Sequence, residues 1–421
     1  MGYGLWVLLS PIAYRLLPIT VCCLLFTFIP YSVFADEPLL TIPSAPLNIK
    51  IGVILPLSGK YAAFGEQALK GILLAAGIFE TAQDNKNPTP EIIIRDTRDD
   101  PVATAKAVEE LAFPPPSPPF SKGGEGGVAG IIGPLLSITA MDAAKKAQEL
   151  KVPVITLSQK DGLTSAGDYI FRNFLLPSEQ AKAAAAYAIN KLNYKKFAIL
   201  YPNNPYGIEL ANLFKEEIKK DKGEIVAEGQ YKEGQTYFGK EITQLFKIKE
   251  TEKKEGRRKI KIFEPAVTAD ALYIPDYFDT VGLIAPYLAY YNIKDVKLLG
   301  VSGWNSPRLI ELGGKYVEGA VFVDGFFAGS KRAMTAQFVN NFKNIYAAEP
   351  GIIEAQAYDA TKIIIDAIIR GNGKKEEIRA ALAHVKDFPG ATGDITFDSN
   401  REAVKNLFML EVKNGKIVEI N

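Results

Sequence analysis

Cysteine and histidine are almost absent from this chain of 421 residues. Both cysteines, Cys22 and Cys23, lie in one apolar segment near the N-terminus, and the single histidine is His384. If that segment is removed, the remaining chain can form no disulfide, carry no thiolate nucleophile and bind no metal through cysteine. His384 lies in a predicted helix (residues 376–385), where a lone histidine is typical of a surface or packing position rather than of a catalytic base.

Sequence motifs for catalysis are also missing. The chain has no Walker A sequence and no serine in a G-x-S-x-G or S-x-x-K setting. Asp96, Asp99 and Asp100 (RDTRDDP) could bind a hard metal ion. An aspartate just before Pro101 is, however, typical of a helix N-cap with proline at the first helical position, and we favour the cap. We therefore expect a binding protein that has no enzymatic activity, no metal and no cofactor.

The chain also lacks an excess of charge of either sign. Lysine and arginine number 49, aspartate and glutamate number 48, and the net charge is +1. This balance gives no electrostatic reason to expect nucleic acid as a partner. One local excess lies at residues 247–261, which carry eight basic and three acidic side chains. Such a run predicts a solvated helix end or loop, with a contact surface for a partner as the alternative.

The first 35 residues differ in composition from the rest. Arg15 is their only charged side chain, and residues 16–29 are continuously apolar apart from one proline and two threonines. Small residues stand at positions −3 and −1 of a cleavage site after Ala35. This layout predicts a cleaved secretory signal peptide over residues 1–35, with an uncleaved anchor as the alternative. Residues 36–47 then form a proline-containing spacer.

Strand-like and helix-like segments alternate along the remaining chain. Short apolar β-branched runs predict strands, and longer amphipathic segments between them predict helices. Regular alternation means parallel sheets with helices on both faces, and the strands are too many for one small sheet. The fold class is therefore α/β, with two doubly wound parallel-sheet lobes. The predicted strands are residues 49–54, 92–96, 128–133, 152–157, 196–201, 271–275 and 297–301, and the predicted helices are residues 66–79, 101–113, 138–150, 178–192, 208–220 and 281–291.

A Pro-rich and then Gly-rich stretch, residues 113–127, interrupts this alternation. It can pack neither as a helix nor as a strand, so it predicts a surface loop, most simply a tolerated insertion. Its glycines precede the strand at Val128 instead of following one. We therefore reject a dinucleotide-binding fingerprint here.

Residues 49–65 (IKIGVILPLSGKYAAFG) predict a ligand-binding cleft. They combine a buried strand, a turn that carries Ser58 and the approach to a helix, an arrangement that exposes hydroxyl and backbone N–H groups beyond the carboxyl end of a strand. Later strands also end in hydroxyl and aromatic residues, which suit a carboxylate and an apolar body respectively. The alternative at each position is a simple helix cap, but five such positions favour a shared cleft. The later strand-end positions are Ser137, residues 156–160, Tyr206, Tyr277 and residues 302–304.

Several of these segments resemble one known family. GVILPLSGKYAAFGEQALKGILLA, RDTRDDP, VAGIIGPLLSITA, VPVITLSQ, FRNFLLPSEQA, YPNNPYG and YVEGAVFVDGFF resemble type I periplasmic binding proteins of the leucine/isoleucine/valine-binding class, from Ile49 to the C-terminus. The resemblance implies two lobes joined by three crossovers, which close on a ligand as a hinged clamp. It implies a periplasmic location, a small-molecule ligand between the lobes and an ABC permease as partner. The implied lobes are residues 48–174 with 326–390, and residues 175–325 with 391–421.

The resemblance also implies roles for individual residues. In amino-acid-binding members, groups of the first lobe hold the ligand carboxylate, and they correspond here to Ser137 and the turn Ser158–Lys160. Tyr206 and Tyr277 correspond to the aromatic lining of the second lobe. The resulting expected ligand-binding residues are Ser58, Tyr61, Phe64, Ser137, Ser158, Gln159, Lys160, Tyr206, Tyr277, Ser302 and Trp304.

Two positions depart from the family pattern. Ser302 stands where an acidic residue normally takes the ligand ammonium, and Lys160 stands where a small hydroxyl residue is usual. A buried lysine without the acidic partner would invert the charge preference of the site. We therefore expect an amino-acid-like or small anionic ligand and regard a free α-amino acid as disfavoured.

A second resemblance offers an alternative function. IIGPLLS, ITLSQ, LLPSEQA and the segment ALYIPDYFDTVGLIAPYLAYYNIKDVKLLGVSGWN resemble the binding-protein-like domain of penicillin-binding protein activators. These lipoproteins stimulate peptidoglycan synthases by protein contact. The alternative is thus a regulator of cell-wall synthesis whose partner is a penicillin-binding protein.

Overall fold

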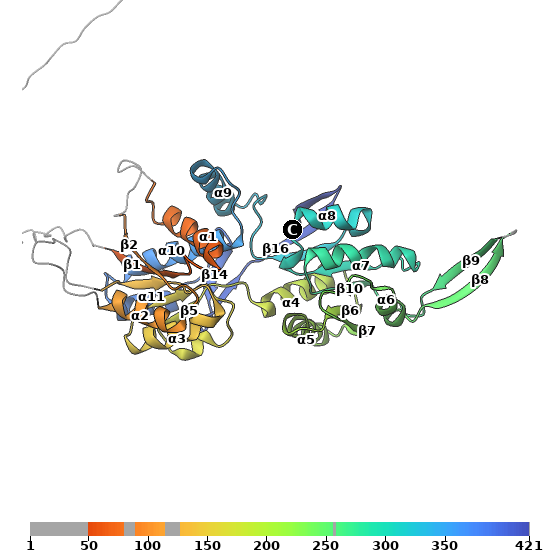
Figure 1. The fold of residues 1–421 in the computed structure, drawn as a ribbon, viewed down its shortest axis with the longest axis horizontal. Coiled ribbons are helices and arrows are strands. Elements are labelled where there is room, and N and C mark those ends of the chain that lie inside the picture. Colours follow the sequence, from red (N-terminus) through yellow and green to blue (C-terminus); the bar gives the residue numbers. More distant parts are fainter. Residues whose placement is uncertain (1–48, 80–88, 114–126, 256–257, 421) are drawn as a thin grey trace, which may run out of the picture. The chain divides into compact units, whose positions relative to one another are not determined.

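The computed structural model describes residues 49–79, 89–113, 127–255 and 258–420 (Figure 1). The predicted signal peptide with both cysteines, the predicted spacer and most of the predicted loop at residues 113–127 lie outside this described part. None of the described helices is both long enough and apolar enough to cross a bilayer.

The first sheet contains five parallel strands with helices on both faces. Side chains alternate between the faces of a strand, so Ile51 and Val53 pack against the apolar face of α10, whereas Ile54 packs with the small apolar residues of α2 and α3. The strand order is β2 (Glu91–Asp96), β1 (Lys50–Leu55), β3 (Gly130–Ile132), β4 (Val154–Thr156) and β5 (Ile170–Arg172). The helices around it are α1 (Ala62–Ala75), α2 (Pro101–Ala112), α3 (Ser137–Glu149), α9 (Ala333–Tyr346), α10 (Ile352–Arg370) and α11 (Lys375–Ala383).

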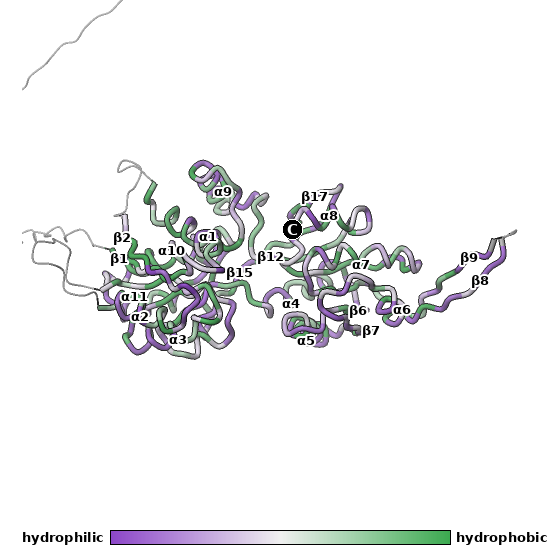
Figure 2. Tube along the Cα trace, in the orientation of Figure 1, coloured by the Kyte–Doolittle hydropathy of each residue, from purple (hydrophilic) through white to green (hydrophobic). Residues whose placement is uncertain are grey.

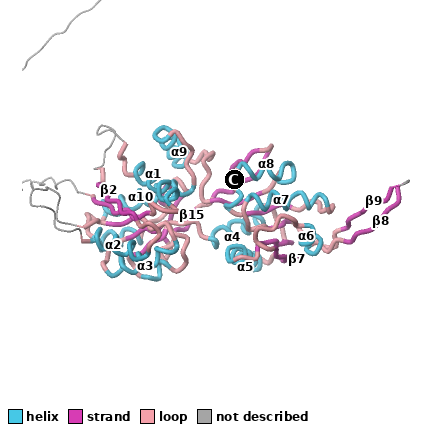
Figure 3. Tube along the Cα trace, viewed as in Figure 1, coloured by secondary structure: helices cyan, strands magenta, loops and turns pink. Residues whose placement is uncertain are grey.

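The second sheet contains seven strands, five of which pair in parallel. The C-terminal segment adds two more, because β16 pairs antiparallel with β12 and β17 pairs antiparallel with β16. Its strand order is β17 (Lys416–Ile420), β16 (Phe408–Lys413), β12 (Val321–Asp324), β11 (Lys297–Gly300), β10 (Ala271–Tyr273), β6 (Lys196–Pro202) and β7 (Glu224–Tyr231). The helices around it are α4 (Pro177–Ala186), which precedes β6 along the chain, and α5 (Pro205–Lys220), α6 (Gly239–Leu245), α7 (Phe278–Tyr290) and α8 (Pro307–Gly313), which follow its strands. The predicted α/β class with parallel sheets is confirmed. Figure 3 shows helices and strands in the regions of both large sheets.

A small third sheet corrects the predicted lobe boundary at residue 390. Its strands are β13 (Phe388–Gly390), β14 (Gly393–Phe397) and β15 (Ala403–Lys405). Ile395 and Phe397 are buried in the same core cluster as Ile51 of the first sheet. Residues 391–405 therefore pack with the first lobe, and the chain passes to the second sheet only between β15 and β16.

Residues 247–261 fold differently from the expected helix end or loop. β8 (Lys249–Glu255) and β9 (Arg258–Glu264) pair with each other as an antiparallel hairpin and with no other described strand (Figure 1). β8 is hydrophilic along its length (Figure 2). The hairpin is held at its base by Phe263, whose ring lies 5.1 Å from that of Tyr291.

The capping interpretation of the aspartate cluster is confirmed. Asp100 accepts hydrogen bonds from the N–H groups of Val102 (2.8 Å) and Ala103 (3.3 Å), and α2 begins at Pro101. The Asp96 carboxylate accepts the N–H of Leu57 at 2.9 Å. Within the described ranges no cluster of histidine, cysteine, aspartate and glutamate is arranged to hold a metal ion.

Candidate ligand-binding site

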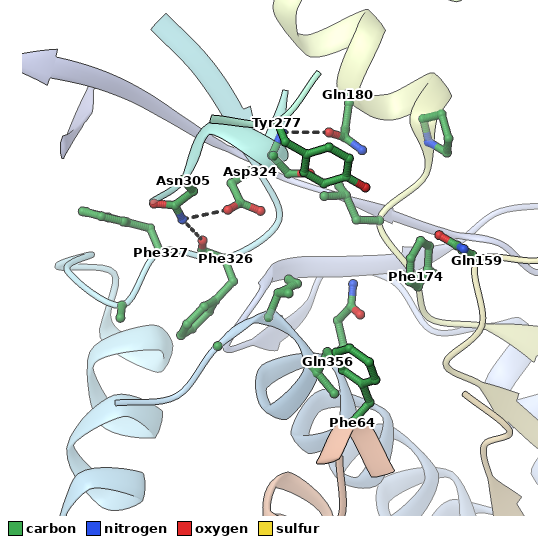
Figure 4. A pocket seen from close by; sticks show the side chains of 18 of the residues that line it. Phe64, Gln159, Phe174, Gln180, Tyr277, Asn305, Asp324, Phe326, Phe327 and Gln356 are labelled. Atoms are coloured by element: carbon green, nitrogen blue, oxygen red, sulfur yellow. Dashed lines mark hydrogen bonds between the residues drawn. The ribbon is translucent and has the colours of Figure 1, made fainter. Parts of the chain in front are cut away.

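A cavity of about 1390 Å³ lies beyond the carboxyl ends of strands from both large sheets (Figure 4). Strands β3, β4, β11 and β12 end next to residues that line it. This is where parallel α/β sheets ordinarily bind ligands, because loops and helix N-termini converge there. Six aromatic side chains contribute to its apolar surface. They are Phe64, Phe174, Tyr206, Tyr277, Phe326 and Phe327.

Two of these aromatic residues form a stacked pair. The rings of Tyr206 and Tyr277 lie 5.7 Å apart with their planes 19° from parallel. Burial raises the pKa of the Tyr206 hydroxyl above its ordinary range, so this group stays protonated and can donate a hydrogen bond. The pair therefore offers a flat apolar wall with polar tips.

A hydrogen-bonding side of the cavity is built on the first lobe. α3 begins at Ser137, and no side chain caps its N-terminus, which leaves backbone N–H groups and the positive end of the helix dipole available. Gln356 of α10 is only 3% exposed, and its Nε2 has no hydrogen-bond partner. Figure 4 shows this side chain directed into the cavity. Together these donors suit a carboxylate.

A buried carboxylate lies on the second-lobe side. Asp324, at the end of β12, is 6% exposed and accepts a 2.7 Å hydrogen bond from Nδ2 of Asn305 (Figure 4). Its other oxygen accepts the N–H of Gly325 at 2.6 Å. Burial raises the pKa of Asp324 to about 7, although these hydrogen bonds oppose the change.

Six of the eleven expected ligand-binding residues line this cavity. They come from both lobes and include the pair at Tyr206 and Tyr277. The six are Phe64, Ser137, Gln159, Tyr206, Tyr277 and Ser302.

The other five expected residues do not line it. The Ser58 hydroxyl donates to Oδ2 of Asp96 at 2.5 Å, and Tyr61 occupies the N-cap position of α1 without a capping hydrogen bond from its side chain. Ser158 is fully buried, and its hydroxyl accepts the N–H of Lys160.

Trp304 and Lys160 were assigned wrongly. Trp304 is fully buried in the core of the second lobe, packed against Phe322, so its ring cannot form a wall of the cleft. Lys160 is exposed instead of buried. The expected inversion of the site's charge by a buried lysine therefore has no structural basis.

Sequence reasoning missed the polar residues Gln180, Asn305, Asp324 and Gln356 and the aromatic residues Phe174, Phe326 and Phe327, all of which line the cavity. Asp324 had a usable signal, because it ends an apolar strand (VFVD) just as the identified positions do. Gln180 and Gln356 lie inside helices, where no strand end marks them in the sequence. Gln180 accepts the N–H of Ser302 at 3.0 Å and thereby holds the β11 loop at the cavity.

Comparison with known proteins agrees with this architecture. The sequence model of the periplasmic binding protein family matches residues 48–416, so the chain belongs to that family. A Leu/Ile/Val-binding protein homolog of Brucella melitensis is 24% identical over 381 residues, covering 89% of this chain and 94% of the relative. Within that family the chain is of the type I, Leu/Ile/Val-binding kind, as the sequence motifs predicted.

Two solved structures share the fold. A putative branched-chain amino acid ABC transporter protein of Rhodospirillum rubrum has a TM-score of 0.75 at 23% identity, covering 89% of this chain and 100% of that one. The substrate-binding protein of the branched-chain amino acid transporter of Streptococcus pneumoniae, solved with isoleucine, has a TM-score of 0.59 at 27% identity, with 89% and 100% covered. These relatives are named as transport proteins, and they lend no support to the predicted alternative of a cell-wall activator.

Proposed function

We propose that this chain is the periplasmic receptor of an ABC transporter and captures a small carboxylate-bearing solute with an apolar body. The observation that carries the proposal is the combination of Ser137, the uncapped α3 N-terminus and the unpartnered amide of Gln356 beside aromatic walls. Hydrogen-bond donors fixed before binding stabilise an anionic group without further ordering cost. The isoleucine bound to the Streptococcus pneumoniae relative is a solute of this kind.

The first test is a binding screen on protein stripped of co-purified ligand by partial unfolding and dialysis. Thermal unfolding is recorded with isoleucine, phenylalanine and 3-phenylpropanoic acid. A ligand present at 100 times its Kd stabilises the native state by about 2.7 kcal/mol, which raises the unfolding temperature measurably. Absence of any shift with carboxylates of this size would contradict the proposal.

Substitution of Ser137 locates the carboxylate. Ser137→Ala is expected to weaken the best ligand of the screen by about 1–3 kcal/mol, because a donor to a charged group is lost. Ser58→Ala is the matched control, since its hydroxyl bonds to Asp96 outside the cavity. Isothermal titration calorimetry measures both variants, and equal affinities would mean that the carboxylate lies elsewhere.

The transport role is tested by co-purification. A tagged, ligand-loaded receptor incubated with solubilised inner membrane is expected to retain ABC permease subunits, identified by mass spectrometry. Recovery of a penicillin-binding protein without permease subunits would instead favour the alternative regulator.

A further inference from the structure

The turn that follows β4, residues 158–161, has little packing of its own to hold it in place. It supplies Gln159 and Asp161 to the lining of the cavity (Figure 4). Residues 159–161 are all exposed, so they are not fixed by burial in a core. Gly162 follows with φ at +70°, a conformation that glycine adopts without strain. An exposed turn of this kind moves easily unless hydrogen bonds fix it.

One buried side chain supplies such hydrogen bonds. Nη1 of Arg172 donates to the carbonyl of Lys160 at 2.6 Å and to that of Gln159 at 3.3 Å. The same nitrogen lies 3.5 Å from Oδ1 of Asp161. Among the residues that the structure describes, no group outside the turn other than this guanidinium forms a hydrogen bond with residues 159–161. The shape of the turn therefore depends on Arg172.

Arg172 is itself firmly held. It is the last residue of β5 and is the only buried arginine in the described part of the chain. Its Nε donates to Oε2 of Glu402 at 2.6 Å, and its backbone N–H donates to the carbonyl of Arg401 at 3.0 Å. A guanidinium can bond to a carboxylate on one side and to carbonyls on another, because its donors form a rigid planar fork. Glu402 thus fixes the guanidinium that fixes the turn.

We propose that Arg172 is a positioning residue for the cavity, which holds the turn at residues 158–161 in its binding shape without contacting the ligand. Arg172 is not one of the lining residues. A wall that is ordered before binding loses less conformational entropy when a ligand arrives, and this favours affinity. The effect on affinity rests on the receptor function proposed above. Because Glu402 lies between β14 and β15, the same contact joins the cavity wall to the third sheet.

Arg401 offers a matched control in the same loop. Its Nε donates to the carbonyl of Ile170 at 3.2 Å, and its Nη2 donates to that of Thr164 at 2.8 Å. These bonds also fasten the loop to the first lobe, but neither carbonyl belongs to the turn or to the cavity lining. A variant of Arg401 therefore loses comparable structural contacts and leaves the turn anchored.

The first experiment compares Arg172→Lys with Arg401→Lys in ligand-free protein. A lysine at position 172 keeps a cation for Glu402, but a single ammonium group cannot reproduce the fork. Backbone order parameters of residues 159–161, from nitrogen-15 relaxation, are expected to be about 0.85 in the wild type and in Arg401→Lys. In Arg172→Lys they are expected to fall below about 0.6. Thermal unfolding of both variants records the loss of overall stability separately.

The second experiment measures binding by calorimetry with isoleucine, phenylalanine and 3-phenylpropanoic acid. For whichever of these probes binds, Arg172→Lys is expected to weaken the affinity by about five- to tenfold. Arg401→Lys is expected to change it by less than about twofold, whatever its effect on the unfolding temperature. A purely structural role for Arg172 would instead lower stability without this difference in affinity.

The outcomes separate this proposal from the receptor function. Unchanged order in the turn of Arg172→Lys, a more mobile turn with unchanged affinity, or an equal loss of affinity in Arg401→Lys would overturn the positioning role. If none of the three probes binds, the receptor proposal fails, and the order parameters still decide whether Arg172 fixes the turn. Circular dichroism checks that Arg172→Lys is folded. If it is not, Glu402→Gln, which keeps the guanidinium but removes its charged anchor, is expected to loosen the turn, and wild-type order there would overturn the proposal.

Discussion

Tyr206 is the residue whose ring and hydroxyl can be tested separately. The ring stacks on Tyr277, and the hydroxyl is kept protonated by burial. Tyr206→Ala is expected to weaken the best ligand by about 1–3 kcal/mol, because both apolar contact and a donor are lost. Tyr206→Phe keeps the wall and is expected to cost about 1 kcal/mol. Calorimetric titration measures both, and an unaltered affinity in the alanine variant would show that this wall does not touch the ligand.

Single residues also show where sequence reasoning succeeds and fails. Ser137 and Tyr277 were predicted because each follows a strand, and both line the cavity. Trp304 also follows such a strand, but the one-turn helix at Ser302–Trp304 carries its ring back into the core. Position after a strand predicts the location of the backbone, whereas the direction of a side chain depends on local turns. A periodicity of two or 3.6 residues carries no information about those turns.

At the scale of elements, periodicity predicted the parallel strands well and the hairpin badly. β1 is almost entirely buried, so its apolar residues identify it directly. β9 does alternate lysine and isoleucine, but β8 (KETEKKE) has no apolar residue at all. The register of β8–β9 follows from pairing between the two strands, and lysines along exposed strand edges oppose pairing with further chains. Because β8 has no apolar residue, the hydrophobic pattern could not identify it as a strand.

A buried polar cluster fastens the third sheet to α10. The carboxylate of Asp359 accepts the N–H groups of Ala391 (2.6 Å) and Thr392 (2.8 Å), and Nζ of Lys405 donates to the Thr392 hydroxyl at 3.0 Å. Burial lowers the pKa of Lys405 to about 8, although the charge of Asp359 opposes this. Burial likewise raises the pKa of Asp359.

Removal of the buried cation from this cluster is expected to destabilise the folded protein. Lys405→Met is expected to lower the free energy of unfolding at pH 7 by about 3–5 kcal/mol, because Asp359 is left as an uncompensated buried charge. The loss should be smaller near pH 4, where Asp359 can take up a proton. Urea denaturation at both pH values measures it. The double variant Lys405→Met with Asp359→Asn should recover part of the stability at pH 7, and no recovery would mean that the lysine acts by packing alone.

At the scale of the whole molecule, the sequence predicted two lobes but placed their final boundary too early. The predicted crossings near residues 174 and 325 lie just after β5 and β12. The third sheet is short, and its contacts with the first lobe run through Ile395 and Phe397 to Ile51, more than 300 residues away in sequence. Such long-range packing has no local signature, so the path of residues 391–405 had to come from the structure.

Asp324 also links the cavity to the stability of the whole molecule. Its pKa is about 7 in the folded protein and near 3.8 in an unfolded chain, so between these values the folded state binds more protons than the unfolded state. The contribution of Asp324 to stability is therefore fully present below pH 3.8, declines as pH rises through about 7 and is constant above that. Ligand-free protein should thus lose stability across this window.

The Asp324→Asn variant isolates this contribution from those of other carboxylates. Its free energy of unfolding relative to the wild type is expected to improve by a few kcal/mol between pH 4 and pH 8, since each unit of pKa difference corresponds to about 1.4 kcal/mol. Urea titrations of ligand-free protein at several pH values supply the two curves, with Glu66→Gln, an exposed carboxylate of α1, as the control. Curves that stay parallel would show that Asp324 ionises as readily in the folded chain as in water.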